Sequence, residues 1–388
     1  MTLARVRGRA SFSRMDAAST WTRTLCVLFF FSGFPALIYQ LVWQRALFRA
    51  FGLNVESVTI VVTAFMVGLG LGSLLGGWLS RKRRVPLLPL LAAIEILTAA
   101  FGLVSLRVFD RVALLALGSS LAVTAAVTLA LVILPTLLMG ATLPVLVAHL
   151  VLRTANVGSS VGTLYFVNTL GAGVACLVAA TALFPFLGLG GSLHLAVAMN
   201  VAVALGAMAV HLRGASATSA HAPDPAGRPN QGGPALGFAP VLALSGLGGF
   251  VSLSYEIFLF RAISYTTGSS ASAFAITLSA YLVGLASGAQ LAGRSCRQAP
   301  RAAMRTALRA LAAGNVLGWA FLPLVSRAAP LGWSVLALAL ALAYLFALCW
   351  GVLLPTLATS ASPPTASRAC GRRRSISRTS PARRPAAS

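Results

Sequence analysis

The residues with the clearest chemical potential are two carboxylates inside long apolar stretches, Glu95 and Glu256. Charged groups are costly in hydrocarbon, so a carboxylate there is a candidate functional group. Glu95 falls near the middle of an apolar run, where an isolated carboxyl must be protonated or paired. Two interpretations of Glu95 stay open: a proton or cation relay, and an interhelical hydrogen bond or ion pair. For Glu256, five residues before Arg261, a structural ion pair or an interfacial anchor beside Tyr255 is favoured.

Aromatic and amide side chains complete a candidate substrate-binding set. Tyr165 and Asn168 are three residues apart and therefore share a helix face. Carboxylates and tyrosine rings suit a cation, such as a polyamine, through charge pairing and cation–π contact. For each amide, Asn200 and Asn315 included, a hydrogen bond between helices is the favoured alternative. The full set is Glu95, Glu256, Tyr39, Gln40, Tyr255, Tyr165 and Asn168.

Other kinds of site find no support in the sequence. The five cysteines are widely scattered, and neither they nor the four histidines form a cluster with the spacing of metal ligands. No Ser-His-Asp set or phosphate-binding loop is visible, so we expect no catalytic residue, metal or cofactor. The arginines of the C-terminal tail lack interleaved aromatic residues, which argues against binding to nucleic acid.

Composition places the chain in a membrane. Of its 388 residues 58% are hydrophobic and only 9% are charged, and the mean hydropathy is +0.87. A soluble protein of this size cannot hide so much apolar surface. About 20 apolar residues are needed to cross the hydrocarbon core. Ten stretches qualify, near 25–43, 57–79, 85–106, 122–152, 157–184, 190–212, 238–258, 270–291, 308–325 and 331–357. The sequence therefore predicts an all-α polytopic bundle whose partner is the lipid bilayer.

The ten stretches divide the chain into five regions. Polar and basic segments flank two groups of apolar stretches, one of six and one of four. The predicted regions are a basic N-terminal tail (1–24), a first transmembrane repeat (25–212), a linker (213–235), a second, incomplete repeat (236–358) and a basic disordered tail (359–388). With the N-terminus placed in the cytoplasm, 24 of the 30 basic residues fall inside and 6 outside. This positive-inside bias predicts that both termini and the linker are cytoplasmic.

An internal repeat is the most informative pattern. A shift of 216 positions aligns two blocks without a gap, and Leu134–Leu137 matches Leu354–Leu357 with a shift of 220. Six helices precede the linker, so both copies enter the membrane in the same direction, as in the two halves of a major-facilitator-type transporter. The gap-free matches are Gly33-Phe34 with Gly249-Phe250, Tyr39-Gln40 with Tyr255-Glu256, Arg45 with Arg261, Gly52 with Gly268, Ala64–Gly72 with Ala280–Gly288, and Gly77 with Gly293.

The composition changes abruptly after Leu357, where the partners of the fifth and sixth helices should follow. The remaining residues are rich in Arg, Pro, Ser and Ala. One interpretation is a natural disordered tail that touches anionic lipid. The other is a truncated or frame-shifted gene.

Four motifs together resemble a bacterial membrane family, the membrane-integral, fused major-facilitator/spermidine-synthase-like proteins. The motifs are Phe31–Arg45, Ala64–Ser73, Leu138–Pro144 and Val161–Ala172, within a resemblance that covers about 29–357. The resemblance implies a location in the bacterial inner membrane and a link to polyamines. Such proteins often carry a soluble aminopropyltransferase domain after their helices, and we expect none among the residues of this sequence. A second departure is Gln40, where the family usually has Glu; the second copy has Glu256.

Two functions follow as hypotheses. The first is a transporter-like or substrate-binding membrane module for a small cationic metabolite. The second is the membrane anchor of a spermidine synthase-like enzyme whose catalytic domain is missing here, or an inactive fragment of one. For the chain alone we expect no aminopropyl transfer, because its longest segment between membrane stretches is too short to form a soluble core.

Overall fold

The computed structural model describes residues 2–51, 55–82, 85–115, 118, 120–154, 157–215, 236–266, 271–298, 300–328 and 334–361. Helices account for nearly all of these residues, and a single bridge between Leu236 and Ala361 is the one β-type pairing among them. The elements are α1 Thr2–Phe51, α2 Val55–Ser80, α3 Leu87–Leu115, α4 Leu121–Thr154, α5 Val157–Val178, the π-helical turn η1 Ala179–Leu183, α6 Phe184–Ala215, α7 Phe238–Thr266, α8 Ala271–Gln298, α9 Pro300–Ala328, α10 Ser334–Gly351 and α11 Leu353–Ser360.

Nine helical stretches in this described part are long and apolar enough to cross a membrane. Only a structure that satisfies its own backbone hydrogen bonds is tolerated in hydrocarbon, which is why apolar segments of this length become helices. The all-α polytopic bundle predicted from the sequence is therefore confirmed.

One of the nine stretches accounts for two crossings. Val157–Arg213 has 57 residues, about 85 Å of helix, against a hydrocarbon core of about 30 Å. Gly188 interrupts it with φ of 64°, a left-handed conformation that glycine adopts without steric cost. Before this break α5 packs on α1 and α8, whereas α6 packs on α1 and α3. The stretch thus folds back at Gly188, in line with the ten crossings expected.

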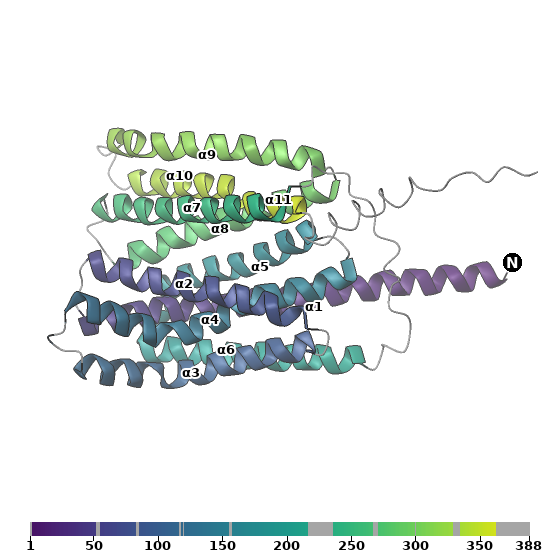
Figure 1. The fold of residues 1–388 in the computed structure, drawn as a ribbon, viewed down its shortest axis with the longest axis horizontal. Coiled ribbons are helices and arrows are strands. Elements are labelled where there is room, and N and C mark those ends of the chain that lie inside the picture. Colours follow the sequence, from purple (N-terminus) through teal and green to yellow (C-terminus); the bar gives the residue numbers. More distant parts are fainter. Residues whose placement is uncertain are drawn as a thin grey trace, which may run out of the picture.

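Several helices extend past the boundaries predicted from hydropathy. α1 already begins at Thr2 and projects beyond the other helices (Figure 1), although its apolar span begins at Trp21. α3 continues to Leu115 and α9 begins at Pro300. A helix must be apolar only along the part that crosses the hydrocarbon core. Its polar ends can extend into water, and a hydropathy profile does not detect them. The linker beyond Ala215 and the tail beyond Ala361 lie outside the described residues.

The helices form two groups. α1–α6 make up one group and α7–α11 the other, and they lie side by side in Figure 1. The main contact between the groups is α5 along α8. Within the first group α2 pairs most extensively with α4, and within the second α8 pairs most extensively with α10.

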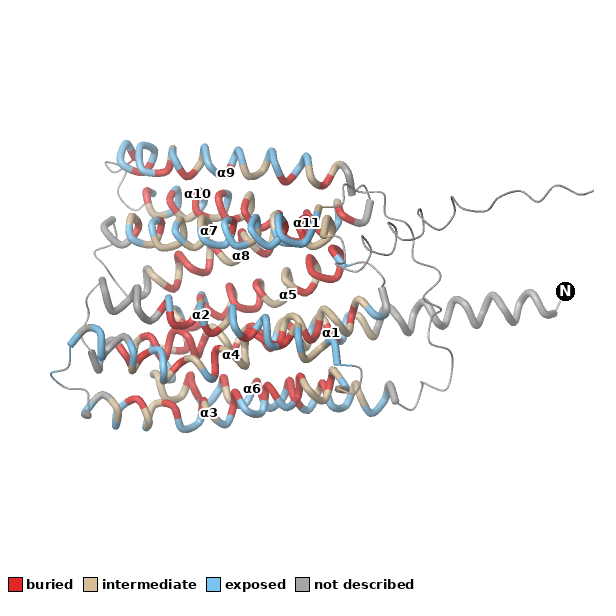
Figure 2. The backbone as a smooth tube through the Cα atoms, in the orientation of Figure 1, coloured by how far each residue is buried: buried red, intermediate tan, exposed pale blue. Residues whose placement is uncertain are grey.

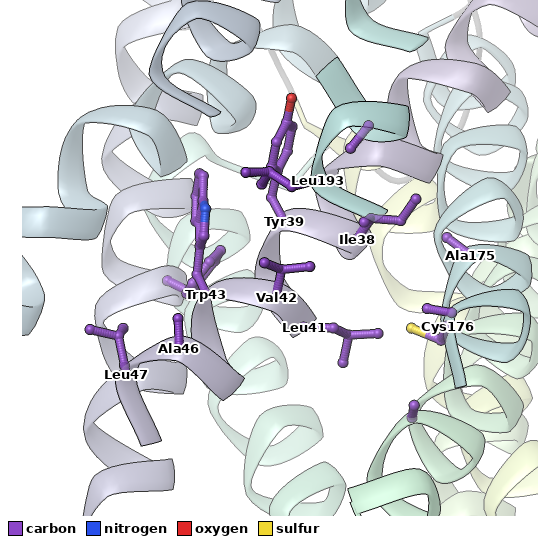
Figure 3. Close-up of a cluster of buried hydrophobic side chains, with 14 of the residues drawn as sticks. Ile38, Tyr39, Leu41, Val42, Trp43, Ala46, Leu47, Ala175, Cys176 and Leu193 are labelled. Carbon is purple, nitrogen blue, oxygen red and sulfur yellow. The ribbon is translucent and has the colours of Figure 1, made fainter. Parts of the chain in front are cut away.

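Buried residues lie in both groups (Figure 2), and the largest cluster joins them, because it includes Ala275 and Leu278 of α8. In the first group, Tyr39 and Trp43 of α1 stack with ring centroids 5.1 Å apart. Figure 3 shows this pair in one cluster with Cys176 of α5 and Leu193 of α6. A second cluster surrounds Phe29 farther along α1. The second group has its own aromatic core around Tyr281, Phe346 and Trp350.

Glycines bring helix backbones together at equivalent places in the two groups. A Cβ on Gly72 would collide with the Leu137 carbonyl of α4, and a Cβ on Gly140 would collide with the Leu69 carbonyl of α2. The same contacts recur between Gly288 and Leu348, and between Gly351 and Leu285. Small residues at helix crossings let backbones approach closely, which is a main source of helix association in membranes.

These recurring contacts define the spatial offset between the groups. Gly102 lies against the ring of Tyr39, and Gly318, 216 positions later, lies against the ring of Tyr255. On α4 and α10 the offset is 211, because Leu137 corresponds to Leu348 and Gly140 to Gly351. Continued past the end of α10, the offset of 211 aligns Leu354–Leu357 with Leu143–Leu146 (Leu-Pro-Val-Leu), whereas the shift of 220 aligns it with Leu134–Leu137, and the repeat stays a prediction.

Candidate functional site

A polar cavity of about 130 Å³ lies inside the first group of helices. All six helices of the group contribute to its wall, and the cavity lies along α1 between the clusters of Phe29 and Tyr39. Its lining residues are Ser32, Gly33, Ala36, Leu37, Gln40, Phe65, Leu69, Glu95, Thr98, Met139, Thr142, Asn168 and Asn200. Three members of the sequence-predicted set, Glu95, Gln40 and Asn168, are therefore brought together.

Glu95 is the charged group of this cavity. It is 3% exposed and lies on α3, about 12 Å along the helix from Leu87. Ser32 of α1 donates a hydrogen bond from its hydroxyl to Oε1 of Glu95 over 2.5 Å. The interhelical hydrogen bond considered as one interpretation of Glu95 is thus present, and the carboxyl also faces the cavity.

The hydroxyl donors of the wall are occupied. The hydroxyls of Thr98 and Thr142 donate to carbonyls of their own helices, at 2.9 and 2.7 Å. The Asn168 amide donates to the Phe29 carbonyl of α1 over 3.3 Å, and a Cβ on Gly33 would collide with Asn168. Asn168 therefore packs α5 against α1 as well as lining the cavity. These commitments leave the lone pairs of the hydroxyl oxygens free, beside the Gln40 and Asn200 amides, which bring both donors and acceptors.

Asn200 adds an unused acceptor. It is 2% exposed, and its Oδ1 has no hydrogen-bond partner among the residues that the structure describes. A buried acceptor without a partner is costly unless a ligand or water supplies a donor. No Lys, Arg or His lines the cavity, and Glu95 makes no ion pair within 4 Å in the described ranges. The cavity thus contains a free buried acceptor and a carboxyl that no cationic side chain pairs.

The tyrosine next to Gln40 has a different place. Tyr39 is fully buried, but it stacks on Trp43 and lies against Gly102 instead of lining the cavity. Consecutive helix residues point about 100° apart, which separates Tyr39 from Gln40. Tyr255 likewise packs against Phe346, with ring centroids 4.5 Å apart, and against Gly318. Tyr165, on α5, is not among the residues that line the cavity.

Glu256 lies in a separate, smaller cavity of about 20 Å³. Val62 of α2 and residues of α7 and α8 form its wall. Thr277 is 3% exposed, and its hydroxyl has no hydrogen-bond partner in the described part of the chain. The ion pair favoured for Glu256 is not found there either, because Arg49–Asp110 is the one ion pair among the described residues. The two membrane carboxylates therefore do not converge on one site.

Five hydroxyl residues in the two cavities escaped the sequence analysis: Ser32, Thr98, Thr142, Thr277 and Tyr281. Thr98 carried a usable signal, since it lies three residues after Glu95 and so shares its helix face. Ser32 carried none, because it meets Glu95 from a helix 63 residues away. Within the described ranges no group of three or more His, Cys, Asp or Glu side chains is placed to hold a metal ion.

Comparison with known proteins gives no assignment. No protein family matches the chain, and no curated protein matches it. The nine apolar helices identify a multi-pass integral membrane protein.

Proposed function

We propose that the chain is a transporter-like membrane module that binds a small cation in the cavity of the first helix group, with Glu95 as the charged ligand. The observation that carries this proposal is a carboxyl only 3% exposed that faces a cavity with no basic residue in its wall. A carboxylate in hydrocarbon needs a proton or another cation to offset its charge.

The remaining wall favours a cation that donates hydrogen bonds. The free Oδ1 of Asn200 is a hydrogen-bond acceptor, so a ligand can bind it only through an N–H or O–H donor. The hydroxyl oxygens of Thr98 and Thr142 keep their lone pairs because their protons are bound to backbone carbonyls. An ammonium group brings three donors and one positive charge, which matches this arrangement.

Cavity size limits the ligand. A volume of about 130 Å³ is well below the roughly 300–1,000 Å³ of sites for drug-sized molecules. A primary amine or a short diamine is therefore the favoured class. A polyamine is the specific candidate implied by the resemblance to the fused spermidine-synthase-like family. That resemblance and the anchoring of a separate aminopropyltransferase stay predictions.

The test is binding of radiolabelled putrescine to the full chain in lipid nanodiscs. Glu95→Gln keeps the size and the hydrogen bond to Ser32 but removes the charge. Hydrogen bonds to charged groups are worth about 1.5–3 kcal/mol, so we expect a 10- to 100-fold weaker Kd. Methylammonium serves as a second probe that fits the same charge site.

The matched control is Glu256→Gln, which removes the other membrane carboxylate outside this cavity. We expect its Kd to stay within threefold of wild type. Equal binding by Glu95→Gln and wild type, at equal membrane abundance, makes Glu95 a structural residue and overturns the proposal. Equal loss in both variants also contradicts it, since the effect then has no link to the cavity.

A further inference from the structure

The second membrane carboxyl, that of Glu256, lies where the two helix groups meet. The wall of its cavity combines Val62 of α2 with residues of α7 and α8. Val62 and Leu278, which the shift of 216 aligns, both belong to this wall. α5 is also near, because the side chains of Tyr165 and Cys176 are close enough to interact electrostatically with Glu256. Helices of both groups therefore surround this carboxyl.

Two polar groups of this cavity are free. Glu256 makes no hydrogen bond among the residues that the structure describes, and no ion pair with Arg261, which is exposed. The Thr277 hydroxyl of α8 is 3% exposed and has no partner in the described ranges. Other buried threonines, such as Thr98 and Thr356, donate to carbonyls of their own helices. Thr277 departs from this pattern while lining the same cavity as the carboxyl.

The third polar side chain of the wall is already bonded. Tyr281 donates from its hydroxyl to the Ser252 carbonyl of α7 over 2.7 Å and meets the Ser252 hydroxyl at 2.8 Å. Ser252 lies about one helical turn before Glu256, so this pair holds α7 against α8 beside the cavity. The rest of the wall is apolar and consists of Val62, Ile257, Phe260, Phe274 and Leu278.

The size and composition of the cavity favour one water molecule and a proton. Its volume of about 20 Å³ exceeds the roughly 10–15 Å³ that one water needs, together with polar partners. Glu256 and Thr277 supply such partners, since they do not bond to each other directly. A metal ion takes oxygen ligands on most sides, whereas most of this wall is apolar. A carboxyl without a cationic partner in such surroundings is offset by a proton.

The titratable groups around this carboxyl bring no positive charge. Tyr281 of α8, and Tyr165 and Cys176 of α5, are close enough to interact with it electrostatically, and none of these residue types carries a positive charge. α2 after Val62, α10 and α11 contain no Asp, Glu, Lys, Arg or His. The tyrosine and the cysteine of α10 lie against α8 and α9 instead.

We propose that Glu256 and Thr277 form a proton-binding site between the two helix groups, in which the protonated carboxyl and the free hydroxyl share one water molecule. With the carboxyl protonated, both groups have a hydrogen-bond partner and the cavity holds no net charge. When the proton leaves to solvent, the Thr277 hydroxyl donates through the water to the carboxylate, so the site binds its proton reversibly. The site is separate from the cavity of Glu95 and does not depend on cation binding there.

Infrared titration of the full chain in lipid nanodiscs tests the site. The chain has only 6 Asp and Glu residues, so the band of a protonated carboxyl is uncrowded. At neutral pH we expect such a band in the wild type and not in Glu256→Gln, which keeps the size of the side chain. Matching spectra would show an ionised Glu256 and overturn the proposal. Loss of the band when sodium chloride replaces choline chloride at constant pH also overturns it, because a metal ion then displaces the proton.

Variants of Thr277 separate a proton site from a packing role. Thr277→Val keeps the shape but removes the hydroxyl, so the carboxylate loses its donor. The midpoint of the acid band should rise by about one pH unit, whereas Thr277→Ser should keep the wild-type midpoint. Thr356→Val is the matched control, because that buried hydroxyl bonds within its own helix, and its midpoint should not change. An unshifted Thr277→Val, or an equal shift in Thr356→Val, overturns the proposal.

Discussion

The interior of the first helix group is hollow and polar, whereas the equivalent place in the second group is filled by aromatic and aliphatic side chains. By the packing offsets, Met139 corresponds to Trp350 and Thr98 corresponds to Gly314. A Cβ on Gly314 would lie 3.2 Å from Nε1 of Trp350, so the indole occupies the space beside this glycine. Where the first group has a cavity, the second group has Trp350.

Three more cavity residues differ between the groups in the same sense, whereas Gln40 corresponds to another polar residue, Glu256. Glu95 corresponds to Leu311, which packs on the core around Trp350. Ser32 corresponds to Gly248, beside Leu353, and Thr142 corresponds to Leu353 itself. Positions that pack helices together, such as Gly102 and Gly318 against their tyrosines, are the same in both groups. The scaffold is shared and the polar interior is not, which supports assigning the cavity a specific role.

Filling the cavity should give the largest effect. Met139→Trp places an indole where the second group has Trp350. We expect putrescine binding to be lost, with Kd raised at least 100-fold, because the side chain occupies the cavity volume. Binding in nanodiscs measures this, and size-exclusion elution checks that the variant folds. Wild-type affinity in Met139→Trp would show that the cation binds elsewhere.

Replacing Trp350, which fills the corresponding space of the second group, by a smaller residue should lower stability moderately and leave putrescine binding unchanged. Trp350→Met removes a side chain that is 8% exposed and leaves a void at Gly314. Such a void costs about 1–3 kcal/mol, less than a full truncation of a buried aromatic residue. The thermal midpoint in detergent should fall by several degrees while the putrescine Kd stays within threefold. An unchanged midpoint would mean that Trp350 does not fill the space as described.

The exposed ion pair of the first group should matter least. Arg49 and Asp110 pair at 3.0 Å with side chains 63% and 60% exposed, and the corresponding positions of the second group are Tyr265 and Ser326. Exposed ion pairs contribute about 0–1 kcal/mol. Asp110→Asn should therefore leave the thermal midpoint within about 2 °C of wild type at moderate salt. A larger drop would assign this pair a structural role that the second group lacks.

The contents of the cavity were only partly predictable. Glu95, Gln40 and Asn168 were named from the sequence as polar residues within apolar stretches. Placing a polar group in hydrocarbon costs free energy, so such residues are candidates for function. Their meeting with Ser32 and Asn200 was not predictable, since these residues come from helices far apart in the chain. Tyr39 was named because a tyrosine ring suits a cation, yet its side chain stacks on Trp43 and does not line the cavity.

The sequence by itself determined the membrane class and the helical state, because a hydrocarbon solvent leaves a long apolar segment no alternative to a helix. It also marked the glycines and tyrosines that recur in both groups. Only the tertiary structure decided which residues share a cavity, that Glu95 and Glu256 lie apart, and that Trp350 fills the second group. Hydropathy encodes that a helix is buried in the membrane, whereas its rotation and crossing depend on side-chain packing between helices distant in sequence.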